Sequence, residues 1–413
     1  MSKILIIGAG HAGTQLAAGL RKQGFQGNVT LVSEETDLPY HKPPLSKTFL
    51  NSPEERLQHL RALSFFASQG IELMLGSKAT AIVPDDKQVI FSDGTTVAYD
   101  RLVLATGTVP VSLNCPGCEL DGVFCLRTAV DARTLRQRLQ KPTDIVVVGG
   151  GFIGLESAAA LAKNGHKVTV LELSDSVLGR ACSAEVAAKV TSELKDLGVD
   201  VQCGVGVETL QGEKGRVRSV LTSKGNSLKA EIVIVGIGAK PLTELAETAG
   251  LEIENGIKVD CNMQSSCRDV FAIGDCTAFP QTQVNRVLRL ESIQNATEQA
   301  DHLALFLTGE DPKPYSRLPW FWSDIGRVKL QIAGLRHEAN KYMKIERNNG
   351  GYAVYHYKDT KLVCVETIDS GGEHMLARQM VSAGYSPNFE ISSISDLRQL
   401  KNSFSAWKAA RNA

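Results

Sequence analysis

Two six-residue glycine clusters have a spacing that can bind a diphosphate. The first is Gly-Ala-Gly-His-Ala-Gly at residues 8–13, and the second is Gly-Gly-Gly-Phe-Ile-Gly at residues 149–154. In a G-x-G-x-x-G pattern, the first glycine allows a tight turn and the second lets the backbone approach a pyrophosphate. The third lets a helix pack closely on a strand, so that unpaired N–H groups of the helix face the phosphates. The two clusters therefore indicate two dinucleotide sites.

An acidic residue follows each cluster at the distance expected for ribose recognition. Glu34 lies 21 residues after Gly13, and Glu172 ends the apolar segment 168–172. A carboxylate at this place accepts hydrogen bonds from the ribose hydroxyls and repels a 2′-phosphate. Glu172 therefore predicts a preference for NADH over NADPH. One such cluster could be an ordinary glycine-rich loop, but two copies with the same surroundings are poorly explained in that way.

The elements around each cluster are those that would position it. Residues 3–8 and 144–149 are continuous apolar runs, typical of strands buried on both faces of a parallel sheet. A helical pattern and then a second apolar strand follow each cluster, at residues 29–32 and 168–172. Two dinucleotides in one chain are most economically a flavin and a nicotinamide, between which a hydride can pass. Further short strands are predicted within residues 101–107, 232–238 and 271–276.

The order of these elements predicts an α/β fold with two Rossmann-like domains and a third, smaller domain. Residues 1–110 and 241–318 are expected to form the first Rossmann-like domain, with residues 111–240 inserted as the second. Residues 319–413 are expected to form an α+β domain. Their apolar residues alternate at 329–335 and 352–357, and helical patterns follow at 373–383 and 394–411.

Composition excludes several classes of protein. The 413 residues include 45 Lys and Arg and 45 Asp and Glu, so the formal charge is zero, which argues against nucleic-acid or anionic-membrane partners. No apolar run approaches the ~18 residues of a membrane span, and the N-terminal run is too short for a signal peptide. Nine scattered cysteines suit a reducing compartment, so we expect a cytoplasmic protein without a disulfide framework.

More specific segments extend along the whole chain, above all Leu-Pro-Tyr-His-Lys-Pro-Pro-Leu-Ser-Lys at 38–47 and Pro-Trp-Phe-Trp-Ser-Asp at 319–324. Together with the glycine clusters and Gly-Asp-Cys at 274–276, they resemble the FAD-dependent, NADH-linked ferredoxin reductases of bacterial oxygenase systems. The resemblance implies a glutathione-reductase-like pair of dinucleotide domains. It also implies hydride transfer from NADH to FAD, followed by single-electron transfer to a two-iron two-sulfur ferredoxin that serves a haem monooxygenase or a Rieske oxygenase. No protein-bound metal is implied.

The resemblance also assigns residues. Lys47 and Glu156 would lie near the flavin and the nicotinamide and pair with each other, and Trp320 would stand beside the flavin on the path by which electrons leave. The FAD site would comprise Gly8, Gly10, His11, Ala12, Gly13, Glu34, Lys42, Lys47, Ala79, Arg127, Gly274, Asp275 and Ile293. The NADH site would comprise Gly149, Gly151, Ile153, Gly154, Glu156, Glu172 and Gly238.

The chain departs from this family pattern just after Asp324. Ile325-Gly326-Arg327 replaces the Gln-Tyr-Asp common in relatives, which bears on how a partner docks. Residues 321–413 hold 13 Lys and Arg against 9 Asp and Glu, which favours an acidic ferredoxin docking near the C-terminal domain.

Two other functions remain open. A thiol–disulfide oxidoreductase could use the Cys-x-x-Cys pair Cys115 and Cys118, although this pair falls between domains and away from the expected flavin. A flavoprotein that senses NADH would hold a reduced flavin for a long time, whereas an electron-transfer enzyme would reduce dyes quickly.

Overall fold

The computed structural model describes residues 2–52, 54–347, 350–388 and 396–412. The chain divides into two compact units. The first unit comprises residues 1–42, 57–109 and 239–317, and the second comprises residues 43–56, 110–238 and 318–413. The second unit therefore includes the short segment 43–56 as well as the regions predicted as a nicotinamide domain and a C-terminal domain. The three predicted domain boundaries stay predictions.

The first unit is built on a five-stranded parallel sheet. Its strands are short apolar runs, and consecutive residues such as Leu102 and Val103 are both buried, so both faces are covered, as expected for a sheet between helices. Helices α1 (His11–Lys22) and α8 (Ile293–Leu307) pack against each other. The strand order is β19 (Val270–Ala272), β7 (Arg101–Leu104), β1 (Lys3–Ile7), β2 (Asn28–Val32) and β3 (Ile71–Met74).

Smaller elements complete the first unit. A 3₁₀ turn, η2 (Gly274–Cys276), follows β19, so the predicted strand 271–276 ends early. The backbone turns there at Gly274, whose φ of +82° favours glycine. The other elements are α3 (Leu63–Ser68), β4 (Ala79–Val83), β5 (Gln88–Phe91), β6 (Thr96–Ala98), β8 (Thr108–Pro110), β17 (Ala239–Pro241), α7 (Glu244–Thr248), β18 (Ile257–Lys258), β20 (Thr277–Gln281) and β21 (Arg286–Leu288).

The second unit repeats this plan with another parallel sheet. Its order is β12 (Asp200–Cys203), β11 (Lys167–Glu172), β10 (Asp144–Val148), β16 (Ile232–Val235) and β9 (Val123–Cys125). The matching order and the helix after β10 confirm that the sequence repeat is a structural repeat. The elements around this sheet are η1 (Pro43–Ser46), α2 (Thr48–Asn51), α4 (Ala129–Arg138), α5 (Phe152–Lys163), α6 (Ala184–Asp196), β13 (Val207–Glu213), β14 (Arg216–Thr222) and β15 (Ser227–Lys229).

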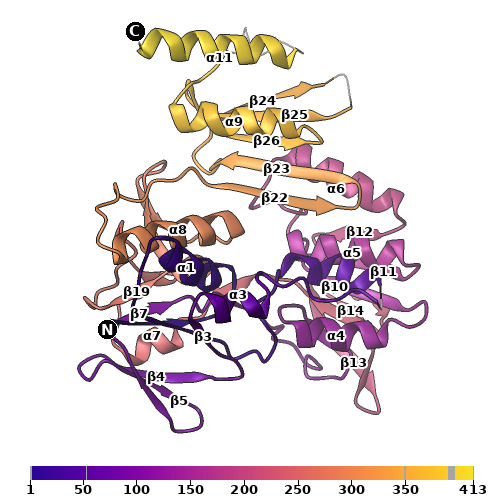
Figure 1. Ribbon diagram of the computed structural model, residues 1–413. Helices are drawn as coiled ribbons and strands as arrows, with labels where there is room; N and C mark the ends of the chain where they lie inside the picture. The colour runs from indigo at the N-terminus through magenta and orange to yellow at the C-terminus, as the bar shows by residue number, and fades with distance from the viewer. Residues whose placement is uncertain (1, 53, 348–349, 389–395, 413) are drawn as a thin grey trace. The chain divides into compact units, whose positions relative to one another are not determined.

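The C-terminal part of the second unit is an antiparallel sheet with helices on one face. The strand order is β22 (Trp320–Ile325), β23 (Val328–Gly334), β26 (Lys361–Ile368), β25 (Tyr352–Lys358) and β24 (Lys341–Glu346). Helix α9 (Gly371–Ala383) packs on β23 and β26, and α11 (Leu397–Asn412) packs on α9 (Figure 1). The predicted α+β character is confirmed. Residues 394 and 395 of the predicted last helix lie outside the described residues. None of the described helices is both long and apolar enough to cross a membrane.

Candidate dinucleotide and electron-transfer sites

The first glycine cluster forms an open cradle at the start of α1. Gly8 has a φ of +112°, and a Cβ there would lie 2.2 Å from the Ala105 carbonyl oxygen. A Cβ on Gly13 would lie 1.9 Å from the Gly8 carbonyl oxygen, so helix and strand pack as closely as glycine permits. A Cβ on Gly10, by contrast, would meet nothing within 4 Å. Gly10 has no side chain with which to cap α1, so this cradle fits a pyrophosphate.

The second cluster repeats this geometry at the start of α5. Gly149 has a φ of +106°, and a Cβ there would lie 2.4 Å from the Gly236 carbonyl oxygen. A Cβ on Gly154 would lie 2.3 Å from the Gly149 carbonyl oxygen. A Cβ on Gly151 would meet only the Gly236 carbonyl oxygen, at 3.8 Å. Each unit therefore has one dinucleotide cradle of its own.

The two predicted ribose acids differ in how they are held. The Glu172 carboxylate accepts a 2.6 Å hydrogen bond from the Gly150 N–H and a 2.7 Å bond from the Ser174 N–H. It is therefore fixed at the carboxyl end of β11, beside the second cradle. The Glu34 side chain is 67% exposed and pairs with Lys78 at 2.9 Å. An exposed ion pair of this kind is weak, so Glu34 can exchange Lys78 for ribose hydroxyls.

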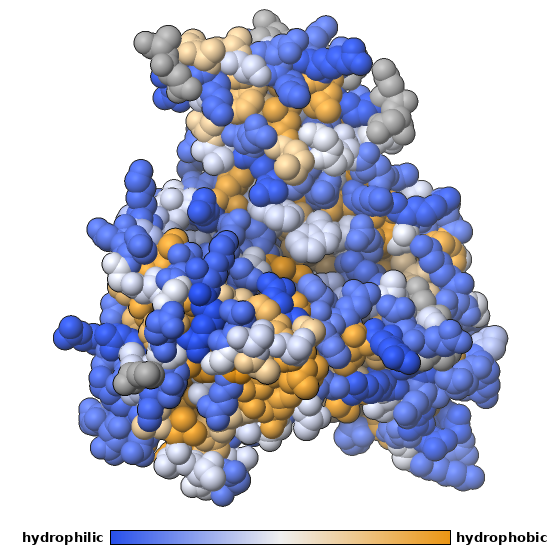
Figure 2. All heavy atoms as spheres, viewed as in Figure 1, coloured by the Kyte–Doolittle hydropathy of each residue, from blue (hydrophilic) through white to orange (hydrophobic). Residues whose placement is uncertain are grey.

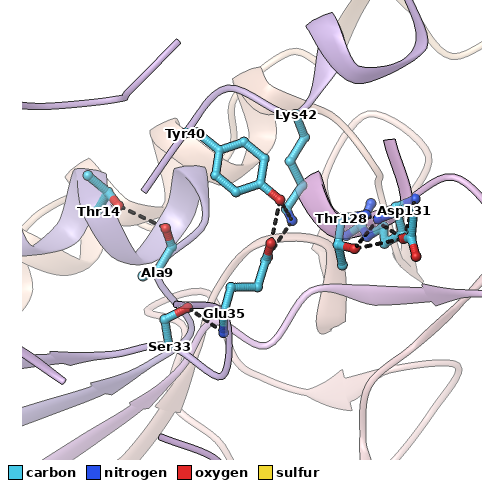
Figure 3. Close-up of polar contacts among 9 residues, drawn as sticks. Ala9, Thr14, Ser33, Glu35, Tyr40, Lys42, Thr128 and Asp131 are labelled. Atoms are coloured by element: carbon cyan, nitrogen blue, oxygen red, sulfur yellow. Dashed lines mark hydrogen bonds and ion pairs between the residues drawn. The ribbon is translucent and has the colours of Figure 1, made fainter. Parts of the chain in front are cut away.

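Lys42 is bound to a neighbouring acid that the sequence did not single out. Its Nζ lies 2.8 Å from Glu35 Oε1 and 4.9 Å from the centre of the Tyr40 ring (Figure 3). The Tyr40 hydroxyl donates to the other oxygen of Glu35, and the Glu35 N–H donates to Ser33 Oγ at 3.1 Å. This network orders the segment after β2, which contains half of the family motif at residues 38–47.

The turn at Gly274 brings the Gly-Asp-Cys motif against α1. A Cβ on Gly274 would lie 3.0 Å from the Cβ of Ala12, and its N–H donates to Gln299 Oε1 at 2.7 Å. Asp275 follows at the carboxyl end of β19, which is where parallel sheets bind ligands. Ile293 begins α8 and Ala79 begins β4. Gln299, which anchors this turn from α8, was missed because a lone glutamine in a helical pattern carries no sequence signal.

The predicted pair of Lys47 and Glu156 is present within the second unit. Lys47 Nζ lies 3.1 Å from Glu156 Oε1 and 3.7 Å from Asp324 Oδ2. Two serine hydroxyls also donate to Glu156, Ser46 at 2.9 Å and Ser323 at 2.6 Å. The pairing is confirmed, whereas the two serines were not singled out from the sequence.

Trp320 lies on β22 inside an aromatic and cationic cluster. The Arg378 guanidinium stands 4.2 Å from the centre of its ring system, and the rings of Trp322 and His374 lie at 5.4 and 5.7 Å. Burial of His374, helped by Arg378, lowers its pKa to about 4. The imidazole is therefore neutral at physiological pH and leaves Arg378 as the cation beside Trp320.

Three other predicted contact residues are described by their local surroundings. The Arg127 N–H donates to Asp131 Oδ2 at 3.1 Å, next to the Thr128 and Asp131 capping box that begins α4 (Figure 3). Ile153 is 46% exposed on the first turn of α5, which leaves an apolar side chain beside the second cradle. Gly238 has a φ of +120°, and a Cβ there would meet nothing within 4 Å.

The turn where the chain departs from its family pattern contacts α6 of the same unit. The Arg327 Nε lies 3.1 Å from Glu193 Oε1, and its terminal nitrogen lies 3.0 Å from Oε2. Gly326 has a φ of +65°, and a Cβ there would lie 2.5 Å from Glu193 Oε1. Lys163 Nζ donates to the Gly326 carbonyl oxygen at 3.0 Å. The substituted residues therefore join the C-terminal sheet to the dinucleotide-binding part of this unit.

The Cys115 and Cys118 pair lacks the electrostatics of a redox site. Burial raises the pKa of the Cys115 thiol, and the neighbouring Cys118 raises it further. A reactive cysteine needs the opposite shift, because the thiolate is the nucleophile. Both cysteines are free thiols.

Comparison with known families agrees with this geometry. The family model described as pyridine nucleotide-disulphide oxidoreductase matches residues 2–300, and the model described as reductase C-terminal matches residues 320–400. The chain belongs to the pyridine nucleotide-disulphide oxidoreductase family. This membership confirms the predicted enzyme class, an oxidoreductase.

Three similar proteins are named as reductases. Rhodocoxin reductase of Rhodococcus erythropolis is 39% identical over 92% of this chain and 89% of its own length. Putidaredoxin reductase of Pseudomonas putida is 37% identical over 92% of this chain and 91% of its own. The ferredoxin reductase of the CYP199A2 system from Rhodopseudomonas palustris has a TM-score of 0.93 at 36% identity, covering 97% of this chain and 100% of that one. The resemblance to ferredoxin reductases is confirmed.

Proposed function

We propose that this protein is a ferredoxin–NAD(+) reductase that takes a hydride from NADH onto FAD and passes electrons singly to an iron–sulfur ferredoxin. The observation that carries the proposal is the pair of open cradles at Gly10 and Gly151, each on its own parallel sheet. Bound FAD supplies the chemistry of accepting an electron pair and releasing it one electron at a time. One NADH and two oxidised ferredoxins then give NAD⁺, two reduced ferredoxins and one proton.

The first unit would hold FAD and the second would hold NADH. At Gly10 the backbone and the N-terminus of α1 take the FAD pyrophosphate, with Glu34 directed to the ribose and Asp275 to the ribityl hydroxyls. At Gly151 the same arrangement takes the NADH pyrophosphate. The fixed carboxylate of Glu172 accepts from the adenosine ribose and repels a 2′-phosphate, so NADH is preferred over NADPH.

Lys47, Glu156 and Trp320 are the residues that we assign to the electron path. The Lys47 ammonium would stabilise the negative charge that develops when a hydride is transferred. Glu156 fixes the position of that ammonium. Trp320 offers an aromatic surface on the side from which electrons leave, held by the guanidinium of Arg378.

A stopped-flow experiment on the purified protein tests this assignment. We expect a yellow protein with one non-covalent FAD per chain, reduced rapidly by NADH and able to reduce dyes. Lys47→Met should slow flavin reduction without loss of FAD. A colourless protein whose melting temperature does not respond to FAD would overturn the proposal. A reduced flavin that persists in the presence of dyes would instead favour a flavoprotein that senses NADH.

The thiol alternative has its own discriminating experiment. We expect no turnover with disulfide substrates, and the double variant Cys115→Ser and Cys118→Ser should reduce ferredoxin as well as the parent protein does. Loss of ferredoxin reduction in this double variant would restore the thiol–disulfide function.

A basic helix supports an acidic two-iron two-sulfur ferredoxin as the partner. Helix α11 carries four cations and no acid, and so accounts for the whole excess of 13 basic over 9 acidic residues in segment 321–413. Leu400 and Phe404 are buried in a cluster with residues of α9, and where α11 lies Figure 2 shows hydrophilic residues beside some hydrophobic ones. Opposite charge on the partner would raise the rate of encounter. The four exposed cations are Arg398, Lys401, Lys408 and Arg411.

Charge reversal on α11 tests the identity of the partner. The double variant Lys401→Glu and Lys408→Glu should slow reduction of an acidic ferredoxin at low salt and leave NADH reduction of the flavin unchanged. The matched control, Lys189→Glu and Lys224→Glu, changes the same charge at exposed sites elsewhere in the second unit. Electrostatic steering also predicts that the rate of ferredoxin reduction by the parent protein falls as ionic strength passes ~0.15 M. Equal rates for both double variants would remove the electrostatic claim.

The place of the reaction follows from the partner. Such a ferredoxin would carry electrons onward to a haem monooxygenase or a Rieske oxygenase. A similar solved structure is named as the ferredoxin reductase of the CYP199A2 system. We further propose a cytoplasmic location, because nine scattered cysteines suit a reducing compartment. We expect genes for a ferredoxin and an oxygenase next to the gene for this protein. We also expect to recover the reductase in the cytosolic fraction.

A further inference from the structure

The carboxylate of Glu156 is enclosed by three donors within the second unit. Lys47 Nζ and Ser323 Oγ lie 3.1 and 2.6 Å from Oε1, and Ser46 Oγ lies 2.9 Å from Oε2. Glu156 itself is 8% exposed. A buried carboxylate needs such donors, because removing its charge from water without them is costly. Both oxygens of Glu156 are therefore held in place.

The two serines reach Glu156 from distant parts of the chain. Ser46 is 110 residues away in sequence, on η1, and Ser323 is 167 residues away, on β22. Both are buried, at 5% and 0% exposure. Because the Ser323 hydroxyl is completely buried, water has no open route to replace it if it is removed.

Lys47 has a second acid within reach. Asp324 Oδ2 lies 3.7 Å from Lys47 Nζ, and the Asp324 side chain is 52% exposed. If Glu156 turned away, the flexible lysine could follow the exposed carboxylate toward solvent. The orientation of Glu156 therefore determines whether Glu156 or Asp324 holds the Lys47 ammonium.

We propose that Ser323 and Ser46 are positioning residues for NADH oxidation: they hold the Glu156 carboxylate in the orientation that fixes the Lys47 ammonium. The proposal rests on the role given above to Lys47 and Glu156. Ser323 acts only through Glu156, and the strand that carries it also carries Trp320, so one strand supports both the entry and the exit of electrons.

Four variants separate this role from simple packing. Ser323→Ala removes the shorter hydrogen bond, and Ser323→Thr keeps the hydroxyl. Ser157→Ala is the matched control, because Ser157 neighbours Glu156 on α5, is fully buried, and its hydroxyl has no hydrogen-bond partner within the described residues. Ser46→Ala removes the longer bond and carries the test if Ser323→Ala does not fold.

Two readouts are measured on each holoenzyme. The first is the rate of flavin reduction by NADH in stopped flow. The second is the rate at which the Lys47 amine is acetylated, followed by peptide mass spectrometry with the exposed Lys189 as internal reference. The second readout does not depend on turnover, and a merely structural serine would not change it.

Ser323→Ala should slow flavin reduction about tenfold, as expected for loss of one hydrogen bond to a charged group, and should raise Lys47 acetylation several-fold. Ser323→Thr and Ser157→Ala should match the parent protein in both the rate of flavin reduction and the rate of Lys47 acetylation. The proposal is overturned if Ser323→Ala behaves like Ser157→Ala, or if it slows reduction without changing Lys47 acetylation. If Lys47→Met and Glu156→Gln also leave reduction unchanged, the assigned roles of those residues fail as well. If these two variants are slow and Ser323→Ala is normal, the positioning role alone fails.

Discussion

Arg327 and Glu193 form a two-pronged ion pair that joins the β22–β23 turn to α6. The Arg327 N–H also donates to Glu193 Oε1, at 2.8 Å. Burial raises the pKa of Glu193, but the hydrogen bonds and charge of Arg327 outweigh it, and the net pKa is lowered. The connection therefore depends on Arg327, in the segment 325–327 where the sequence was expected to depart from the family pattern.

Arg327→Ala should lower the free energy of unfolding, because it removes the hydrogen bonds that the Arg327 side chain donates to the buried Glu193 carboxylate. Urea unfolding at pH 7 measures this. Arg218→Ala is the control, since its ion pair with Glu213 is exposed and should be worth less than about 1 kcal/mol. Because the folded pKa of Glu193 is lowered, the stabilisation exists above the unfolded value near 4.3 and is lost as pH falls through the folded value. A deficit in Arg327→Ala that persisted unchanged at pH 3 would contradict the assignment to Glu193.

Breaking the ion pair of Arg347 and Glu373 should destabilise the protein more than breaking the pair of Arg327 and Glu193. Its two side chains are 7% and 0% exposed, and the Tyr355 hydroxyl also donates to Glu373. Glu373→Ala would remove one partner of a buried ion pair, at a cost of about 3–5 kcal/mol in unfolding free energy. Glu346→Ala, which removes an exposed partner of Lys344, should cost less than about 1 kcal/mol. Equal effects in denaturant titrations would show that the buried pair is not needed.

His374 should make stability fall as pH is lowered. Its folded pKa is about 4, below the ordinary histidine value of about 6.5, so the unfolded chain takes up a proton first. Stability is therefore complete above about pH 6.5 and declines toward pH 4, by up to about 3 kcal/mol. His374→Phe should remove this part of the pH dependence. Parallel curves of unfolding free energy against pH for the two proteins would refute the prediction.

A matched pair of glycine variants should separate the two cofactors. A Cβ on Gly10 meets nothing within 4 Å, and the backbone there has a φ of −75°, which suits alanine. Gly10→Ala should therefore leave the flavin-free protein as stable as the parent and weaken FAD binding, because the methyl group occupies the approach of the pyrophosphate. Gly151→Ala should weaken NADH binding and keep FAD. Calorimetric titration and the ratio of flavin to protein absorbance measure the two effects, and loss of FAD in Gly151→Ala alone would reverse the assignment.

Glu172 should control the choice of nucleotide. Glu172→Ala removes the acceptor for the ribose hydroxyl and the charge that repels a 2′-phosphate, so kcat/KM for NADH should fall about tenfold and the preference over NADPH should narrow. Asp175→Ala, which changes a nearby exposed acid, is the control. Comparable efficiency of the parent enzyme with NADH and NADPH would contradict the role of Glu172.

The sequence alone determined the two parallel sheets and their cradles, because these depend on local patterns. Buried strands must be apolar on both faces, and only glycine fits where Gly13 would place a Cβ 1.9 Å from the Gly8 carbonyl oxygen. The pairing of Lys47 with Glu156 was also foreseen, but only through a family motif, since no local rule relates residues 109 positions apart.

Tertiary structure decided which polar side chains meet those residues. Ser323, Ser46 and Gln299 are ordinary residues in sequence, and they matter because the fold buries their hydroxyl or amide groups beside a carboxylate or a turn. The basic excess of segment 321–413 could be counted from the sequence, but its place on the outer side of α11 follows from the packing of Leu400 and Phe404. A buried charge or hydroxyl must find a partner wherever the chain brings one, and that choice is made by packing over long sequence distances rather than by local pattern.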